Sequence, residues 1–264
     1  MKILKKLGIM GLVIGLAIGV VGCSSSGKDD KTNEEIVTLN ISAAASLQEA
    51  ITELEVKFKE KEPNVKLEIN LGASGALQQQ IEEGAPCDVF ISAGQKQMND
   101  LSDKNLLLED TNKTLVTNDL VLVGSKGITF KELDELSKNS ISKIAIGDPE
   151  SVPAGKYAKE VLDNTKLYNK VKDKLVLAKD VKEVLAWVQQ GNAEVGFVYL
   201  SDAQGTNGVD IVYTTKPDSH SPINYPIAVL KSSQKQDKAK VFEEFLLSQD
   251  GQNILEKYGF KKVN

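Results

Sequence analysis

Apolar residues recur along most of the chain with two different periods, and these periods predict short strands alternating with helices. From Val37 to Ser42 every second residue is apolar, which is typical of a strand with one buried face. From Leu47 to Phe58 the apolar residues recur at helical spacing. Further strands are predicted at 65–71, 88–92, 120–123, 143–146 and 194–199, and further helices at 76–83, 154–164, 181–190 and 238–258. This alternation is typical of an α/β fold with a parallel sheet covered on both faces.

Two apolar extended segments, 118–124 and 224–230, lie where the chain can cross between two lobes. About 230 residues remain after the N-terminal region, which is enough for two domains of ordinary size. We therefore predict one lobe from residues 36–118 together with 228–264, and a second lobe from residues 119–227.

The N-terminal region differs in composition from the rest of the chain. Three lysines precede an uncharged stretch from Leu7 to Gly22 and then Cys23, which is the order of a secretory signal peptide. The stretch falls short of the roughly 20 apolar residues of a membrane-spanning helix. The sequence Val-Val-Gly-Cys ending at Cys23 resembles a bacterial lipobox, so we expect residues 1–22 to be removed and Cys23 to carry a lipid. The alternative is an ordinary signal peptide cut nearby. Residues 23–35 are polar and predict a flexible tether.

Composition and charge narrow the classes of partner. The formal net charge is −5 with both signs interspersed, so no basic patch indicates nucleic acid. The chain contains no arginine, and any anion site must therefore do without a guanidinium group. The second cysteine, Cys87, adjoins an apolar run and is interpreted as a small buried hydrophobic residue.

Several predicted helices begin with residues that are typical of N-terminal caps or first turns: Ser46, Ser74, Pro153 and Asp180. Ser46 with Glu49 has the spacing of a capping box. The proline leaves the backbone amide of Ala154 free, and the aspartate stands directly before Val181. Unpaired amides and the helix dipole favour negative charge, so several helix starts meeting at one cleft would bind an anion. Ordinary capping is the alternative for each residue taken alone.

The motifs of common enzymes are absent or incomplete. The sequence Gly-Ala-Ser-Gly-Ala around Ser74 lacks the last glycine of a nucleophile elbow. Residues 155–157 do not complete a phosphate-binding loop. The only histidine, His220, lies in a polar stretch and is predicted to be solvated, and one histidine cannot build the usual zinc sites. An exported serine hydrolase around Ser74 stays open as a second class of function.

Four segments, with a fifth near the C-terminus, carry a family resemblance: Ala-Ala-Ala-Ser-Leu at 43–47, Gly-Ala-Pro-Cys-Asp-Val-Phe-Ile-Ser-Ala at 84–93, Gly-Asp-Pro-Glu-Ser-Val-Pro-Ala-Gly at 147–155, Val-Tyr-Leu-Ser-Asp-Ala at 198–203 and Lys-Tyr-Gly-Phe at 257–260. In this order they resemble the periplasmic molybdate-binding proteins of bacterial ABC importers. The match runs collinearly from about Val37 to Phe260. Cys87 departs from the family pattern, which would have a small residue there.

The resemblance implies an α/β fold of the type II periplasmic-binding-protein class, in which two lobes joined by two crossover segments close like a clamshell on the anion. It assigns hydroxyl contacts to Ser46 and Ser74 in one lobe, and to the other lobe the backbone amides of Ala154 and Val181 and the hydroxyl of Tyr199. These residues would hold molybdate and also tungstate as oxyanions, without a cofactor, a cation ligand or a catalytic group.

The partners and location follow from the same resemblance. The importer's permease and ATPase are the expected partners of a monomeric protein outside the cytoplasm, held at the membrane by the lipid on Cys23. Neutral donors without an acceptor suit a fully ionised dianion better than a protonated phosphate. Alternatives are a sulfate-type or other oxyanion-binding protein of the same fold, and a lipid-anchored sensor or adhesin.

Overall fold

The computed structural model describes residues 36–263. The predicted signal peptide, Cys23 and the predicted tether lie outside the described residues. Within 36–263, no helix combines the length and the apolar character that crossing a membrane requires.

The first sheet contains the parallel strands that the alternating pattern predicts. Its order is β2-β1-β3-β10-β4, with β1 parallel to β2 and β3 and with β10 antiparallel to β3 and β4. On β1, Leu39 and Ile41 are buried while Asn40 between them is partly exposed, because alternate side chains point to opposite faces. The strands are β1 (Val37–Ala44), β2 (Val65–Gly72), β3 (Val89–Ile91), β4 (Lys113–Thr117) and β10 (Asn224–Val229).

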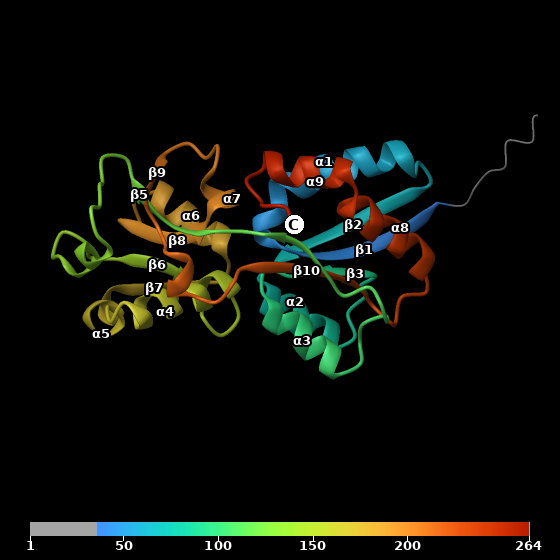
Figure 1. The fold of residues 1–264 in the computed structure, drawn as a ribbon, viewed down its shortest axis with the longest axis horizontal. Helices are drawn as coiled ribbons and strands as arrows, with labels where there is room; N and C mark the ends of the chain where they lie inside the picture. Colours follow the sequence, from blue (N-terminus) through green and yellow to red (C-terminus); the bar gives the residue numbers. More distant parts are fainter. Residues whose placement is uncertain (1–35, 264) are drawn as a thin grey trace, which may run out of the picture. The chain divides into compact units, whose positions relative to one another are not determined.

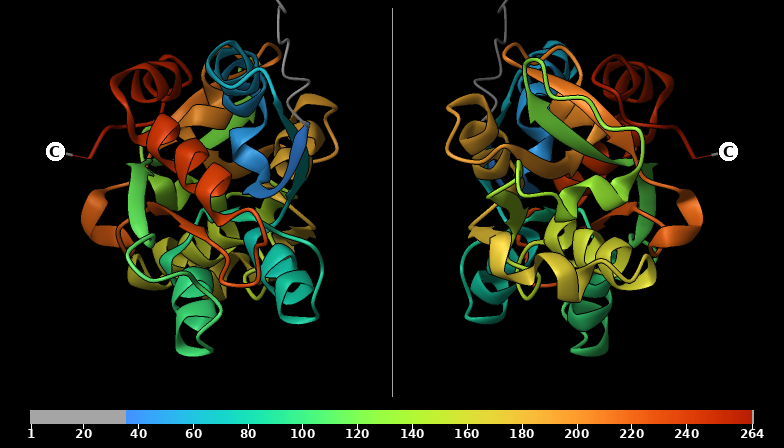
Figure 2. Two further views of the ribbon diagram at one scale, coloured as in Figure 1. Left: turned by 90° about the vertical axis from the view of Figure 1, so that its right-hand side faces the viewer. Right: turned by 90° about the vertical axis from the view of Figure 1, so that its left-hand side faces the viewer.

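Helices cover both faces of this sheet (Figure 1). One face is covered by α1 (Gln48–Lys61), α8 (Gln236–Leu247) and α9 (Gln249–Lys257). The other face is covered by α2 (Ser74–Glu82) and α3 (Gln95–Asp103). The two views of Figure 2 show the red C-terminal helices and the green α3 apart on opposite faces. We call this sheet with its five helices the first lobe.

The second lobe is built around another mixed sheet, with the order β7-β6-β8-β5-β9. Its strands are β5 (Leu120–Ser125), β6 (Ile144–Gly147), β7 (Leu175–Ala178), β8 (Val195–Tyr199) and β9 (Val209–Thr214). Its helices are α4 (Pro153–Asn164), α5 (Tyr168–Val171), α6 (Val181–Gln189) and α7 (Leu200–Ala203). The strands β6 and β8 run parallel, and α4 and α6 pack on opposite faces of them (Figure 1). The predicted two-lobe α/β fold is therefore confirmed.

Two connections join the lobes. The chain leaves the first sheet at Thr117 and enters the second at Leu120, and it returns through residues 215–223. Strand β10 pairs with β3 and β4 from Asn224 onward. The predicted second lobe includes residues 224–227. These residues lie in the first sheet instead, because their backbone groups pair with β3 and β4. The remaining lobe limits stay predictions.

Other elements differ from the sequence prediction in detail. The single helix predicted at 238–258 is two helices, since Ser248 is extended and its hydroxyl caps α9 by accepting a bond from the amide of Gly251. The strands β4, β7 and β9 and the helices α3, α5 and α7 were not predicted. Strands β7 and β9 lie at the edges of the second sheet and are only partly buried, so their sequences do not alternate clearly.

Candidate anion-binding site

A small cavity brings together all five residues that the sequence analysis singled out as ligand contacts. The empty space between its walls is about 210 Å³, counted together with the open solvent at its mouth. Its walls combine residues of both lobes: Ala44, Ala45, Ser46, Gly72, Ala73, Ser74, Ala93, Val152, Pro153, Ala154, Asp180, Val181 and Tyr199. The cavity therefore suits a small ion.

The cavity lies beyond the carboxyl ends of several strands. Ala44 and Gly72 are the last residues of β1 and β2, and Tyr199 is the last residue of β8. The wall residue Ala93 comes two residues after β3 ends. Binding sites of open α/β sheets gather at this edge, because the loops after parallel strands meet there and the following helices begin there.

In the second lobe, two helices begin in the cavity wall. Helix α4 starts with Pro153, whose ring suits the first turn. Gly155 lets this start approach β6, since a Cβ atom at this position would lie 1.9 Å from the carbonyl oxygen of Gly147. Ala154 follows the proline in the cavity wall.

Helix α6 has the capping pattern that we predicted. The carboxylate of Asp180 accepts a hydrogen bond of 2.9 Å from the amide of Glu183. The carboxylate of Glu183 accepts one of 2.8 Å from the amide of Lys179. The cap thus fixes the first turn, where the amide of Val181 has no partner within the helix.

In the first lobe, Ser46 does not form the predicted capping box. It lies in a 3₁₀ turn (Ala45–Leu47) between β1 and α1, and its hydroxyl makes no cap bond. Its Oγ lies 2.8 Å from the hydroxyl oxygen of Tyr225. Glu49 bonds Lys182 at 2.6 Å instead of reaching back along the chain. The prediction was wrong because partners distant in sequence occupy both side chains.

Ser74 is the first residue of α2 and is almost fully buried. Its Oγ accepts a hydrogen bond of 2.9 Å from the amide of Ala93. Since the oxygen acts as acceptor in this bond, the hydroxyl hydrogen remains available for a group inside the cavity.

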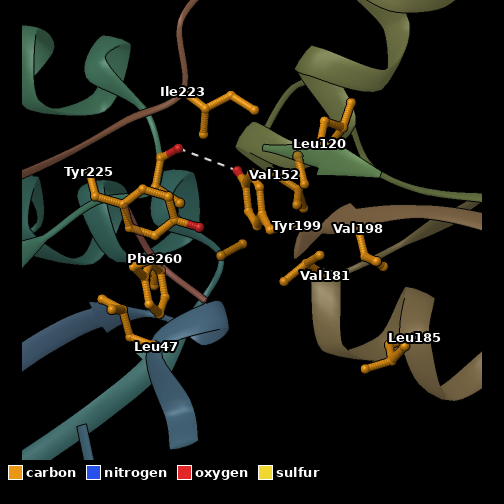
Figure 3. Close-up of a cluster of buried hydrophobic side chains, with 14 of the residues drawn as sticks. Leu47, Leu120, Val152, Val181, Leu185, Val198, Tyr199, Ile223, Tyr225 and Phe260 are labelled. Carbon is orange, nitrogen blue, oxygen red and sulfur yellow. Dashed lines mark hydrogen bonds between the residues drawn. The ribbon is translucent and has the colours of Figure 1, made fainter. Parts of the chain in front are cut away.

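Tyr199 provides the third hydroxyl. Its ring is buried, and its hydroxyl donates to the carbonyl oxygen of Ala93 across the lobes at 3.3 Å, drawn as the dashed line in Figure 3. Burial raises the pKa of Tyr199 well above its ordinary value. The hydroxyl therefore keeps its single hydrogen at every physiological pH, and it can donate to an anion only when this hydrogen turns from Ala93 towards the cavity.

The chemistry of the cavity wall is that of a neutral donor set. Apart from three hydroxyls and the helix-start amides, the side chains of the wall are apolar except for Asp180, which is engaged in its cap. Within residues 36–263, no cluster of histidine, cysteine and carboxylate side chains could hold a metal ion. Such a wall has the chemistry to bind an anion.

A group of ionised side chains spans the two lobes beside Val181. The Nζ atom of Lys182 lies 2.6 Å from a carboxylate oxygen of Glu49 on α1 and 2.9 Å from one of Asp202 on α7. The two oxygens of Asp202 lack a well-oriented hydrogen-bond donor, so this contact is mainly electrostatic. Burial raises the pKa of Asp202 to about 6, although Lys182 acts in the opposite direction.

The sequence analysis missed Tyr225, Asn118 and Asp202, which all lie close to the proposed contacts. Asp202 belongs to a segment that carries the family resemblance, and the other two lie in the predicted crossover segments. The sequence analysis therefore covered the segments that contain these residues. It could not identify their side-chain partners, because these partners lie 20 to 179 residues away in the sequence.

Cys87 and His220 bear on the predicted buried thiol and on the alternative of a serine hydrolase. Cys87 is buried as predicted, and burial raises the pKa of its thiol to about 11. His220 was predicted to be solvated but is partly buried, because its ring bonds Thr215 and the carbonyl oxygen of Ser221. Neither contact involves Ser74, so this histidine is not placed to activate that serine.

Comparisons with known proteins agree with this geometry. A family model described as bacterial extracellular solute-binding protein matches residues 39–261. YvgL of Bacillus subtilis, provisionally named an ABC transporter substrate-binding lipoprotein, is 41% identical over 97% of this chain and 98% of its own. The molybdate-binding protein ModA of Escherichia coli is 38% identical over 84% of this chain and 88% of its own.

A solved structure extends the comparison to the fold. The substrate binding domain of a provisionally assigned molybdenum ABC transporter from Clostridium difficile is 58% identical, with a TM-score of 0.68 over 86% of this chain and 100% of that domain. The family match covers nearly all the described residues and places the site of action outside the cytoplasm. The chain therefore belongs to the bacterial extracellular solute-binding proteins and is a relative of ModA.

Proposed function

We propose that this protein captures molybdate outside the cytoplasm and delivers it to an ABC importer. The observation that carries the proposal is the meeting of three hydroxyls and two helix starts at one small cavity between the lobes. The names of the ModA relatives support molybdate as the ligand. Ser46, Ser74, Ala154, Val181 and Tyr199 are the proposed contacts.

The number of donors is sufficient for tight binding. Hydrogen bonds to a charged group contribute about 1.5–3 kcal/mol each. Five of them contribute about 7.5–15 kcal/mol, so bonds of average strength or better supply the about 8 kcal/mol of a micromolar complex and leave a margin for desolvation and lobe closure. Apart from Asp180, which caps α6, the wall carries no acidic side chain, which favours a fully ionised dianion over a phosphate that must donate its proton.

Contacts between the lobes support a mechanism in which the anion stabilises the closed form. The amide of Gly75 on α2 donates to the carbonyl oxygen of Ser151 in the second lobe at 2.9 Å. The ion pair of Glu49 with Lys182 joins the lobes at another point. An anion held by donors from both lobes adds to these contacts and shifts the equilibrium towards closure. The importer's permease, working with its ATPase, would then recognise the closed form.

The finer parts of the proposal concern anchoring and selectivity. We propose that Cys23 carries a lipid that holds a monomeric protein at the membrane, and the name of YvgL supports this lipid. Tungstate has the same charge and shape as molybdate, so the same donors are proposed to bind it. We also propose that the protein is not an enzyme and needs no cofactor, since its relatives are solute-binding proteins.

A binding protein for sulfate is the second candidate. Sulfate has the same charge and tetrahedral geometry with shorter bonds, so only the size of the closed cavity separates it from molybdate. Calorimetric titration of the purified protein with molybdate, tungstate, sulfate and phosphate tests the choice. We expect strong binding of the first two and at least about hundredfold weaker binding of the others. Preference for sulfate, or no binding of any of the four anions, would contradict the proposed function.

A further inference from the structure

A buried chain of hydrogen bonds connects Ser46 with both crossover segments and with the second lobe. It runs from Ser201 on α7 to Asn118, from Asn118 to Tyr225 on β10, and from Tyr225 to Ser46. All four residues are at most 9% exposed. Water therefore does not supply the partners of these groups, and the direction of each bond follows from the donors and acceptors present.

The first bonds of the chain fix the orientation of the Asn118 amide. The backbone amide of Asp119 donates to Oδ1 of Asn118 at 2.9 Å, so this atom is the acceptor. Nδ2 then carries both hydrogens, one directed to Ser201 Oγ at 2.8 Å and one to the Tyr225 hydroxyl at 3.4 Å. Asn118 thus acts only as a donor towards Tyr225.

The bond from Asn118 to Tyr225 determines the direction of the bond between Tyr225 and Ser46. The Tyr225 hydroxyl accepts from Asn118, so its single hydrogen is left for Ser46 Oγ at 2.8 Å. Burial raises the pKa of Tyr225 well above its ordinary value, so this hydrogen stays in place. The ring packs edge-on against Tyr199 and Phe260 (Figure 3), and the ring centroids are 5.6 and 5.3 Å away.

Ser46 is therefore an acceptor towards Tyr225 and has one hydrogen left, which it can direct into the cavity that it lines. We infer that Tyr225, oriented by Asn118, is a positioning residue that directs the Ser46 hydrogen into the cavity, so that Ser46 meets the anion as a donor and favours fully deprotonated oxyanions. This inference rests on the proposed function. Accepting a bond also polarises the Ser46 hydroxyl and strengthens it as a donor.

The consequence concerns anions of equal charge. Molybdate and monohydrogen phosphate are both dianions, but only phosphate carries a hydrogen that needs an acceptor. With Tyr225 in place, one of the two lone pairs of Ser46 is occupied and its hydrogen cannot point towards Tyr225, which favours the orientation with the hydrogen in the cavity. Without the tyrosine hydroxyl, the Ser46 hydrogen can also point towards residue 225, which turns a lone pair to the cavity that can accept a bond from the protonated anion.

The test is calorimetry on the full-length protein in detergent with molybdate, and with phosphate in competition, above the second pKa of phosphate. In Tyr225→Phe the ring remains and only the hydroxyl is lost. We expect the affinity for molybdate to fall about three- to tenfold. We expect the affinity for phosphate to hold or rise, so that the ratio of the two dissociation constants shrinks by about threefold or more.

Two further variants separate this role from a structural one. In a Ser46→Ala background, Tyr225→Phe should no longer change the ratio, because the hydroxyl that it orients is gone. Tyr157→Phe is the control, since it removes another buried tyrosine hydroxyl, one that bonds Pro222 outside the cavity wall. Both affinities should stay as in the wild type.

Each outcome decides the matter. An unchanged ratio in Tyr225→Phe, including phosphate binding that stays too weak to detect, overturns the inference alone. A change of the same size in the Ser46→Ala background also overturns it, because the effect would then come from packing. A wild-type protein that binds no molybdate contradicts the proposed function and the inference with it.

Discussion

The two lobes orient their donors by different means. In the second lobe, the amides at Ala154 and Val181 stand in the first turns of helices, where Pro153 and the cap of Asp180 fix the backbone locally. In the first lobe, the hydroxyls of Ser46 and Ser74 depend on groups 179 and 19 residues away in sequence. The second-lobe donors are part of the backbone and survive most side-chain substitutions, whereas the first-lobe donors depend on tertiary contacts. A substitution in the first lobe can therefore remove a donor, whereas a substitution at a helix start of the second lobe leaves the backbone donor and only makes its position less fixed.

The largest expected effect on molybdate affinity comes from a substitution that keeps the two lobes from approaching each other. A Cβ atom at Gly75 would lie 2.5 Å from the carbonyl oxygen of Ser151, so Gly75→Ala should hold the lobes apart. We expect the affinity for molybdate to fall about 10- to 100-fold while the melting temperature changes little. Scattering should show less compaction on adding molybdate. Ala76→Ser, which enlarges the exposed neighbour, is the control. Normal affinity and compaction in Gly75→Ala would contradict the closure mechanism.

Tyr199 is the one proposed second-lobe donor that belongs to a side chain, so it should behave like the hydroxyls of the first lobe. Tyr199→Phe removes the hydroxyl and keeps the packing of the ring. We expect a loss of about tenfold in molybdate affinity by calorimetry, with an unchanged circular dichroism spectrum. The same change at Tyr157 should have no effect. Wild-type affinity in Tyr199→Phe would remove this residue from the site.

The local cap of α6 should matter less, because the amide of Val181 remains when the cap is lost. Asp180→Ala removes the acceptor for the amide of Glu183, and Asp180→Asn keeps an acceptor without the charge. We expect Asp180→Ala to be about 1 kcal/mol less stable in urea unfolding than Asp180→Asn, and to bind molybdate a few-fold more weakly. Equal stability of the two variants would show that the cap does not fix this half of the site.

The smallest predicted effect concerns the ion pair behind the α6 start. Burial raises the pKa of Asp202 from 3.8 to about 6, so the folded chain binds a proton there more tightly than the unfolded chain. Lowering the pH from about 7 to about 5 should therefore raise this group's contribution to the free energy of unfolding by about 1 kcal/mol, and the gain is lost again as the pH rises through about 6. Urea unfolding at both pH values should show this gain in the free energy of unfolding in the wild type, and the gain should be missing in Asp202→Asn. The same pH dependence in both proteins would contradict the raised pKa.

The sequence predicted features that depend on local pattern. The alternation on β1, the apolar face of α1 and the cap at Asp180 all follow from residues close together in the chain. The family resemblance identified five residues that do line one cavity, because strand ends and helix starts are marked by short motifs. Whether these residues bind an anion stays a prediction.

Features that depend on tertiary contacts could not be predicted. Ser46 and Glu49 have the spacing of a capping box, yet a hydrogen bond to Tyr225 and an ion pair with Lys182 replace it. The break at Ser248 is invisible in a pattern that stays apolar on both sides. The orientation of Asn118 follows from three partners in different elements, and the sequence does not reveal that they meet.

The most direct test of the central claim is a crystal structure of the protein with molybdate, using the anomalous signal of molybdenum. The account predicts one strong peak in the cavity, with oxygens in hydrogen-bond contact with the hydroxyls of Ser46, Ser74 and Tyr199 and with the amides of Ala154 and Val181. A peak on surface lysines, or no peak in the cavity at saturating molybdate, would contradict it.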